Sequence, residues 1–296
     1  MKEPHPIYLH INYFENRYPL EEAFAHTRKL GCTGIEVRDR DRSGAIALDD
    51  YLALTARLSR EHGLDIVYGC RVETTDPDPA KREASIANFH KVLEHARRNG
   101  FQLLNVFTGI LMAPGLRFSK AGSTLATEDD WRVSTEVLSE AAAKFPTLTL
   151  AVETHSGYLH DLAEECARLL CRVNRPNVRA NLDFGNIHIN RRGTSWRESL
   201  NALKGSIGYL HLKNVRTGPD REEGDFDRVP LSEGDLDIAA MLRDLQAAGF
   251  TGPIGLENTM KEDKLPIARA DLRYLRECLG GLIPECGDLT HPAQSS

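Results

Sequence analysis

Residues 147–155 read TLTLAVETH, an apolar run that closes on a glutamate and a histidine. Such a run is typical of a buried strand, and the polar pair marks its end. Short runs of the same form recur along the chain. Together they predict eight strands, at Ile7–Ile11, Gly34–Val37, Asp65–Gly69, Gln102–Phe107, Thr147–Glu153, Val178–Asp183, Ile207–Lys213 and Pro253–Glu257.

Longer amphipathic segments separate the predicted strands. They predict helices at Leu20–Leu30, Leu48–His62, Ala80–Asn99, Glu128–Lys144, Leu162–Val173, Ile238–Ala248 and Pro266–Leu279. Strands that alternate with helices are joined by crossovers and run parallel. About eight such units in 296 residues predict a single-domain α/β fold, a (β/α)₈ TIM barrel, with an open doubly wound sheet as the alternative. We assign residues 1–286 to the barrel and residues 287–296 to a flexible C-terminal tail.

The composition is that of an ordinary globular protein. Hydrophobic residues make up 41% of the chain and charged residues 27%, which excludes a mainly disordered protein. The net charge is −6 and no basic cluster stands out, so we expect no nucleic-acid partner. No apolar run reaches the ~18 residues of a membrane span. We therefore expect no membrane association and a cytoplasmic location, with the six cysteines reduced.

Four successive predicted strands end in residues that bind metal ions in proteins: Glu153, Asp183, His211 and Glu257. In a (β/α)₈ barrel the carboxyl ends of the strands form the active-site face. Three carboxylates and an imidazole in one cleft repel one another unless a cation neutralises them. We therefore predict one divalent metal ion, Mn²⁺ or Mg²⁺, with Zn²⁺, Co²⁺ and Fe²⁺ as alternatives. The competing interpretation is four strand-end residues paired with lysine or arginine.

Other polar residues follow the same strand ends. His155 lies two residues after Glu153, on the same face if the strand continues, where a neutral imidazole can act as general acid or base. The candidates for substrate contacts are Lys213, Arg216, Glu36, Asn186 and His188. For some of these residues a purely structural role is the alternative. Glu36 can pair with Arg38, and Lys213 can neutralise the carboxylates.

The runs GCTGIEVR, VETH, NLDFGN, YLHLKN, SEGDLDI and IGLEN resemble the xylose-isomerase-like sugar phosphate isomerase/epimerase superfamily, and the resemblance covers nearly the whole chain. It implies that Glu153, Asp183, His211 and Glu257 bind one divalent metal, which holds two oxygens of a ketose or other polyol. It also implies that Glu153 and Glu257 take part in proton transfer.

Some positions depart from that pattern. Leu159 stands where the ketose 3-epimerases of this superfamily usually carry a second glutamate, and Asn186 stands where they usually have a histidine. The multi-zinc ligand set of the related AP endonucleases is not matched. The ExH sequence of Glu153 and His155 is similar to the metal-binding subunit of bacterial C-glycoside deglycosidases, which eliminate an aglycone from 3-keto glycosides.

The sequence thus predicts a metal-dependent isomerase or epimerase that acts on a sugar, keto-sugar or polyol through an enediolate-type intermediate. The first alternative is a lyase with the same metal site, either a dehydratase or an enzyme that cleaves 3-keto glycosides or C-glycosides. The second is a non-catalytic metal-binding barrel subunit. The expected partner is a small carbohydrate, and both a homo-oligomer and a small partner subunit are left open.

Overall fold

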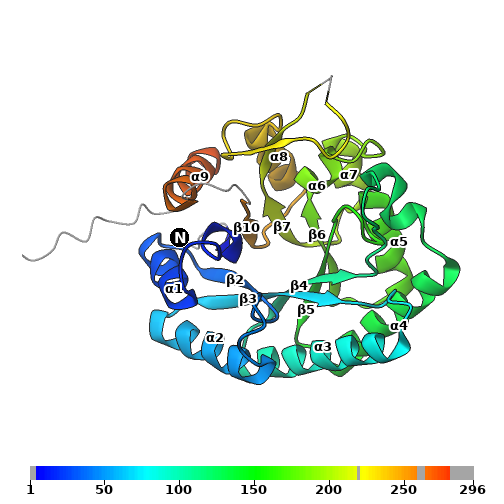
Figure 1. Cartoon of the computed structure of the whole chain (residues 1–296). Coiled ribbons are helices and arrows are strands. Elements are labelled where there is room, and N and C mark those ends of the chain that lie inside the picture. The colour runs from blue at the N-terminus through cyan, green and yellow to red at the C-terminus, as the bar shows by residue number, and fades with distance from the viewer. Residues whose placement is uncertain (1–4, 219–220, 259–263, 281–296) are drawn as a thin grey trace, which may run out of the picture.

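A computed structural model describes residues 5–218, 221–258 and 264–280. Within these ranges, parallel strands close into a barrel in the order β1, β10, β7, β6, β5, β4, β3, β2 (Figure 1). Their bounds are β1 Ile7–His10, β2 Gly34–Arg38, β3 Asp65–Val72, β4 Leu103–Thr108, β5 Thr149–Glu153, β6 Val178–Asp183, β7 Ile207–Leu212 and β10 Ile254–Leu256. The predicted (β/α)₈ barrel is confirmed, and the open doubly wound sheet is wrong. The predicted tail, residues 287–296, lies outside the described residues.

Helices surround the barrel on its outside (Figure 1). They are α1 Leu20–Lys29, α2 Leu48–His62, α3 Pro79–Asn99, α4 Glu128–Lys144, α5 Ala163–Val173, α6 Phe184–His188, α7 Trp196–Ala202, α8 Ile238–Ala247 and α9 Lys264–Cys278. Short 3₁₀ turns follow β1 and β4, at η1 Ile11–Tyr13, η2 Phe118–Lys120 and η3 Gly122–Thr124. After β7, the strands β8 Asn214–Arg216 and β9 Asp227–Val229 form an antiparallel pair.

The sequence prediction missed the two short helices between β6 and β7. The α6 helix has 5 residues and α7 has 7, too few for a hydrophobic period to be recognised. The residues that cap these two helices are what indicates where each helix begins. The side chain of Asp183 accepts a hydrogen bond from the backbone N–H of Asn186 at the start of α6. At α7, Ser195 and Glu198 form a capping box, a pattern that is readable in the sequence.

The α5 helix shows why the outer helices pack against the barrel. Its buried residues are Ala163, Cys166, Leu169 and Val173, whose spacing of three or four places them on one face. The opposite face carries charged residues. Asn174 ends the helix in the left-handed conformation, with φ 47°, and its N–H bonds back to the carbonyl of Leu170.

The apolar residues form two clusters. The larger one fills the layer between the strands and the helices. The smaller one lies inside the barrel and consists of Tyr8, Val67, Leu103, Ala151 and Tyr209. Because side chains alternate along a strand, the residues two positions further on also point inward. The barrel therefore has an apolar floor, and the next inward-facing layer contains Glu153 and His211.

Strand register brings the polar residues of this layer to one level. Asp183 of β6 is paired with His211 of β7, and His10 of β1 is paired with Glu36 of β2. Leu256 of β10 is paired with Leu212 of β7, so Glu257 and Lys213 follow their strands side by side. The hydrogen-bonded register of the closed barrel thus gathers residues that are far apart in sequence.

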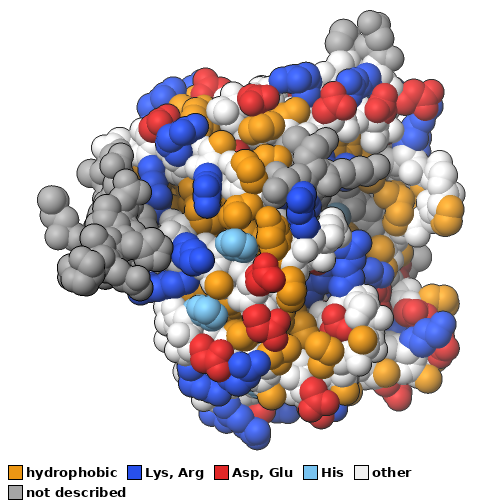
Figure 2. Space-filling view, turned by 60° about the vertical axis from the view of Figure 1, so that its left-hand side comes forward, with side chains coloured by type: hydrophobic (Ala, Val, Ile, Leu, Met, Phe, Trp, Pro, Cys, Tyr) orange, Lys and Arg blue, Asp and Glu red, His pale blue; other side chains and the backbone are white. Residues whose placement is uncertain are grey.

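The outer surface carries charges of both signs. Figure 2 shows them interspersed over the face that includes α1 and α2. None of the helices within the described ranges combines the length and the hydrophobicity that a bilayer span requires. The cysteines that the structure describes are free thiols, and Cys32, Cys70 and Cys166 among them are buried.

Gly255 of β10 leaves room for two side chains of β7. A Cβ at this position would overlap the hydroxyl oxygen of Tyr209 and would lie 2.8 Å from Cδ2 of His211. Gly255→Ala therefore overpacks the barrel interior, and we expect it to lower the free energy of unfolding by about 1–3 kcal/mol. Thermal unfolding should show a melting temperature several degrees lower.

The matched control is Gly218→Ala, because a Cβ there meets only the flexible side chain of Arg221 at 3.4 Å. Equal melting temperatures for the two variants would show that the barrel interior accommodates the methyl group.

Candidate metal centre

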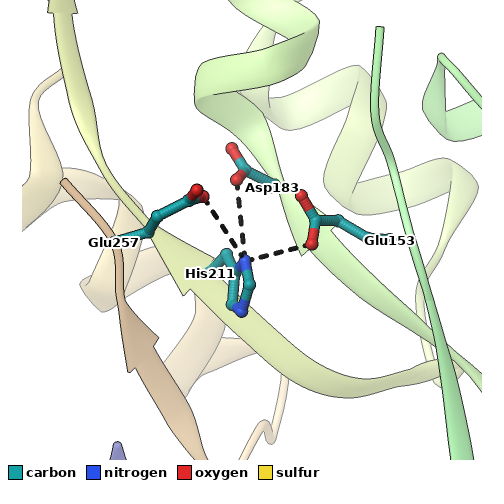
Figure 3. A group of neighbouring side chains, drawn as sticks. All are labelled: Glu153, Asp183, His211 and Glu257. Carbon is teal, nitrogen blue, oxygen red and sulfur yellow. Dashed lines mark ion pairs between the residues drawn. The ribbon is translucent and has the colours of Figure 1, made fainter. Parts of the chain in front are cut away.

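Four metal-binding side chains converge at the carboxyl ends of the barrel strands. Glu153, Asp183, His211 and Glu257 each offer one ligand atom, and these atoms all lie within 4.8 Å of one another. Figure 3 shows Glu153 and Glu257 approaching from opposite sides, with His211 between them. From Nδ1 of His211, the nearest carboxylate oxygen is at 3.2 Å on Glu153 and at 3.8 Å on both Asp183 and Glu257.

A buried glutamate sets the orientation of His211. The Nε2–H of His211 donates to Oε2 of Glu36 over 2.7 Å, which turns Nδ1 toward the other three ligand atoms. Glu36 is fully buried and also accepts hydrogen bonds from Tyr209, at 2.8 Å, and Asn105, at 2.9 Å. Burial lowers the pKa of His211, but Glu36 and Glu153 outweigh this effect and raise it well above its usual value.

The carboxylates of Asp183 and Glu257 are each held by one oxygen, while the other oxygen faces the centre. Oδ1 of Asp183 accepts from the backbone N–H of Asn186 at 3.1 Å. Oε1 of Glu257 accepts from the side-chain amide of Asn12 at 2.8 Å. The second oxygens, Oδ2 of Asp183 and Oε2 of Glu257, each lie 2.9 Å from the ammonium group of Lys213. In each of these two residues, one carboxylate oxygen is thus fixed by a hydrogen bond and the other points toward the centre of the cluster.

Side-chain amides hold Glu153 by both of its oxygens. Asn186 donates to Oε1 at 3.0 Å, and Asn105 donates to Oε2 at 2.6 Å. Burial raises the pKa of Glu153, but the positive charge of His211, whose Nδ1 lies 3.2 Å from Oε2 of Glu153, outweighs it, so that the pKa falls to about 2. Glu153 is therefore ionised at neutral pH.

Lys213 is the cation that faces the cluster. Burial lowers its pKa, but Asp183, Glu257 and Glu153 outweigh burial and raise it. Burial raises the pKa of Asp183 to about 6 despite Lys213, because Glu153 and Glu257 add to the effect of burial. The four carboxylates of Glu36, Glu153, Asp183 and Glu257 thus share Lys213 and two histidines, His211 and His10, the latter 3.7 Å from Glu36.

The donor set fits a divalent cation. Nδ1 of His211 and Oδ2 of Asp183 are buried and have no hydrogen-bond partner of acceptable geometry in the described residues. Carboxylate oxygens and an imidazole nitrogen are ordinary ligands of divalent ions, and the hydrogen bond from Nε2 to Glu36 is the usual support of a metal-binding histidine. A bound ion would replace the proton on Nδ1 and offset the excess negative charge.

His155 lies beside the cluster and is not one of the convergent ligands. Its Nδ1–H donates to the carbonyl of Ser156 at 3.0 Å, which leaves the lone pair on Nε2. Phe107 and Tyr158 pack edge-on against its ring, with centroid distances of 5.5 and 5.0 Å. Burial lowers its pKa more than Glu153 raises it, so the imidazole is neutral at pH 7.

The remaining predicted substrate residues divide into two groups. Lys213 and Asn186 line a pocket at the barrel mouth. Glu36 lies below the mouth and binds His211, not Arg38, which instead pairs with Glu15 at 2.7 Å. The structure does not bring Arg216 and His188 to the cluster. Arg216 donates to the carbonyl of Glu233, and His188 lies 3.7 Å from Asp235.

Sequence reasoning did not predict that buried amides hold the carboxylates of the site. Asn12, Asn105 and Asn181 do so, although Asn105 was a candidate for the pocket wall and Asn181 begins the NLDFGN run. His160 is fully buried: its Nδ1–H donates to the carbonyl of Glu153 at 2.5 Å, and Nε2 accepts from the N–H of Thr108 at 3.1 Å. Burial lowers the pKa of His160 to about 4, so it is a neutral link between β4 and β5.

Two unlike compartments open from the cluster, and His155 and Glu257 line both. The apolar compartment has a volume of about 660 Å³, open solvent included. Phe118, Ile189, Val215 and Phe226 form its hydrophobic wall, and Ser156, Asn214 and Arg228 add polar groups to the lining. The polar compartment has a volume of about 1480 Å³ on the same measure. Its wall includes Arg38, Arg40, Arg42, Arg71, Asp39 and Glu73.

Comparisons with known proteins agree with this architecture. The family model described as "Xylose isomerase-like TIM barrel" matches residues 24–278. No curated protein matches the chain at a significant level. Among solved structures, the IOLI protein with a binding zinc atom is 18% identical, with 94% of this chain and 99% of that chain covered and a TM-score of 0.75.

Two further structures show that enzymes of different reaction types share the fold. D-allulose 3-epimerase from Methylomonas sp., in complex with D-allulose, is 18% identical over 92% of this chain and 96% of that chain, with a TM-score of 0.72. The probable 3-DHS dehydratase AsbF from Bacillus anthracis is 17% identical over 91% and 98%, with a TM-score of 0.70. At these identities the likeness shows the fold alone.

We expect Glu36→Gln to weaken metal binding without removing any of the four ligands. Loss of the carboxylate on Nε2 lowers the basicity of Nδ1 and loosens the ring orientation, which typically costs ~10–100-fold in metal affinity. Calorimetric titration of metal-free protein with Mn²⁺ or Zn²⁺ measures the effect.

Tyr209→Phe is the matched control, because it removes only a second hydrogen bond to the same oxygen of Glu36. If Glu36→Gln folds normally and binds the ion as tightly as the unmodified protein, Glu36 does not control His211.

Proposed function

The chain belongs to the xylose isomerase-like TIM-barrel family, and from this membership and the centre described above we propose that it is a divalent-metal-dependent isomerase or epimerase acting on a sugar, keto-sugar or polyol. The observation that carries the proposal is the convergence of Glu153, Asp183, His211 and Glu257 at the barrel mouth, with the buried Nδ1 of His211 left without a hydrogen-bond partner of acceptable geometry among the residues that the structure describes. A barrel needs no such cluster to fold, because burying like charges is unfavourable.

The four convergent residues would hold the ion, for which we propose Mn²⁺ or Mg²⁺ because three of the four donors are oxygens. When bound, a divalent cation supplies Lewis-acid polarisation of a substrate carbonyl and so lowers the pKa of the adjacent C–H bond. The expected substrate is a small carbohydrate with neighbouring carbonyl and hydroxyl oxygens.

Glu153 and Glu257 are placed to move the proton. They reach the centre from opposite sides, so they face a bound substrate from two directions (Figure 3). The pKa of each is held below its usual value, against the effect of burial, by the cations His211 and Lys213. Both are ionised at neutral pH and able to accept a proton from carbon.

His155 is the third candidate for proton transfer. With Nδ1–H bound to the carbonyl of Ser156, the available lone pair lies on Nε2. His155 lines both compartments, so Nε2 could accept a proton from the substrate and then pass it to a substrate oxygen or to a departing group.

That position favours a second candidate function, a lyase that begins with the same proton removal. A dehydratase or an enzyme that cleaves 3-keto glycosides needs a general acid for the leaving group, and His155 would fit this role once Nε2 has accepted the proton removed from the substrate carbon. Leu159, where the ketose epimerases usually have a glutamate, is fully buried and offers no polar group. A non-catalytic metal-binding subunit is the third candidate.

Metal removal tests the proposal directly. We expect dialysis against a chelator to abolish turnover of ketoses, inososes or 3-keto glycosides, and Mn²⁺ to restore it, because the carbonyl then loses and regains its polarising ion. Elemental analysis should show less bound metal in Glu257→Gln, and Glu233→Gln, on the exposed loop before α8, is the control.

Full activity of metal-free protein would contradict the proposal. Stoichiometric metal without turnover of any of these sugars would support the non-catalytic subunit instead.

Turnover in D₂O distinguishes the two reaction types. An isomerase or epimerase returns the proton to carbon, so we expect a product that keeps the substrate's mass apart from incorporated deuterium. Mass spectrometry and NMR of the product measure this outcome. Loss of water or of an aglycone, with no epimer formed, would show that the protein is a lyase.

In the same assay, His155→Gln should lower kcat while metal content stays unchanged. His188→Gln is the matched control, because His188 lies beside Asp235 and lines neither compartment. Unchanged kcat in His155→Gln would remove His155 from the reaction.

A further inference from the structure

The apolar compartment is built from loops that belong to different parts of the chain. Phe118 lies on the segment between β4 and α4, Ile189 follows α6, and Phe226 lies between β8 and β9. Together with Val215 they place hydrophobic side chains opposite Lys213 and Glu257 of the centre. The wall does not help to hold the metal centre, because none of the four hydrophobic residues in the wall bonds to a carboxylate of the centre.

Glu223 holds these loops together. Its carboxylate accepts hydrogen bonds from the backbone N–H of Ser119 at 2.8 Å, from the hydroxyl of Ser119 at 2.6 Å and from the N–H of Arg191 at 3.0 Å. Arg117 adds an ion pair with Glu222 at 3.4 Å. Phe118 thus stands next to a residue anchored by two hydrogen bonds. The wall is therefore preformed.

The two compartments offer unlike chemistry to the two ends of one molecule. The polar compartment presents guanidinium and carboxylate groups, which bind hydroxyl or charged groups. Arg228 also lines the apolar compartment, with its guanidinium group 4.9 Å from the centre of the Phe226 ring, but the four hydrophobic side chains of the wall offer no hydrogen-bond partner for hydroxyls. A sugar surrounded by hydroxyl groups would have to desolvate some of them against it, which is unfavourable, whereas a flat apolar group gains by burial and by stacking on phenylalanine.

We propose that the substrate is amphiphilic and carries a flat apolar group, such as an aryl ring, which binds against Phe118 and Phe226. Its vicinal oxygens bind at the centre formed by Glu153, Asp183, His211 and Glu257, and its hydroxyl-bearing part points into the polar compartment. The placement of the oxygens rests on the proposed function, and the placement of the apolar group rests on the wall.

A pair of α-hydroxyketones tests the proposal. Hydroxyacetone and 2-hydroxyacetophenone share the same metal-binding head, and only the second carries a phenyl ring. Each is titrated into the full-length protein loaded with Co²⁺, and dissociation constants are obtained from the visible spectrum of the ion and from calorimetry. We expect the phenyl compound to bind about tenfold more tightly or better, as burial of part of a ring implies.

Substitutions in the wall locate the preference. Phe226→Ala and Phe118→Ala should each reduce the ratio of the two dissociation constants several-fold and leave the constant for hydroxyacetone unchanged. Phe226→Leu, which keeps an apolar side chain without a flat face, should lie between, and it serves if the alanine variant unfolds. Leu116→Ala is the matched control, because Leu116 is exposed on the same loop as Phe118 and lines neither compartment.

The outcomes separate this proposal from the proposed function. If both compounds change the Co²⁺ spectrum with equal dissociation constants, the apolar subsite is wrong and the metal-dependent function stands. A preference for the phenyl compound that survives both alanine substitutions also overturns the subsite. If neither compound changes the spectrum of the Co²⁺-loaded protein, both proposals fail together.

Discussion

The hydrogen bond from Nε2 of His211 to the buried carboxylate of Glu36 fixes the direction in which the imidazole can bind. Because Nε2 is occupied, only Nδ1 faces Glu153, Asp183 and Glu257. Glu36 is itself held by Tyr209 and Asn105, and Asn105 also bonds to Glu153. One fully buried carboxylate below the mouth thus orients two members of the cluster above it. A carboxylate buried at this depth is stable only because each of its oxygens has hydrogen-bond donors.

The layers inside the barrel follow from that constraint. Tyr8, Val67, Leu103, Ala151 and Tyr209 form an apolar floor that excludes water from below. Glu36, Asn105 and Asn181 lie fully buried above it, and the convergent ligands lie at the mouth. In such a dry setting, electrostatic interactions are strong, so Lys213 and the ligand carboxylates hold one another charged. Gly255 is part of the same arrangement, since any larger residue would press on Tyr209 and His211.

The mouth of the barrel is asymmetric. Four barrel strands supply the centre, whereas the loops between β4 and α4, after α6 and between β8 and β9 supply the apolar wall. An epimerase, a dehydratase and a zinc-binding protein with the same barrel are all less than a fifth identical to this chain. Because one fold serves proteins of different function, the residues that the loops add at the mouth carry information that the barrel itself does not.

The alternation of strands and helices could be predicted from the sequence alone, because hydrophobic periodicity is a local property of the chain. The sequence also indicated which strand ends carry Glu153, Asp183, His211 and Glu257, since parallel strands in a barrel expose their carboxyl ends on one face. The bonding partner of Glu36 was decided only in three dimensions: His211 lies 175 residues away in sequence and meets it across the barrel. The roles of Asn12, Asn105 and Asn181, the separation of Arg216 and His188 from the cluster, and the wall formed by Phe118 and Phe226 were decided in the same way. Each depends on strand register or on loops meeting across the mouth, and such long-range contacts leave no periodic signal in the chain.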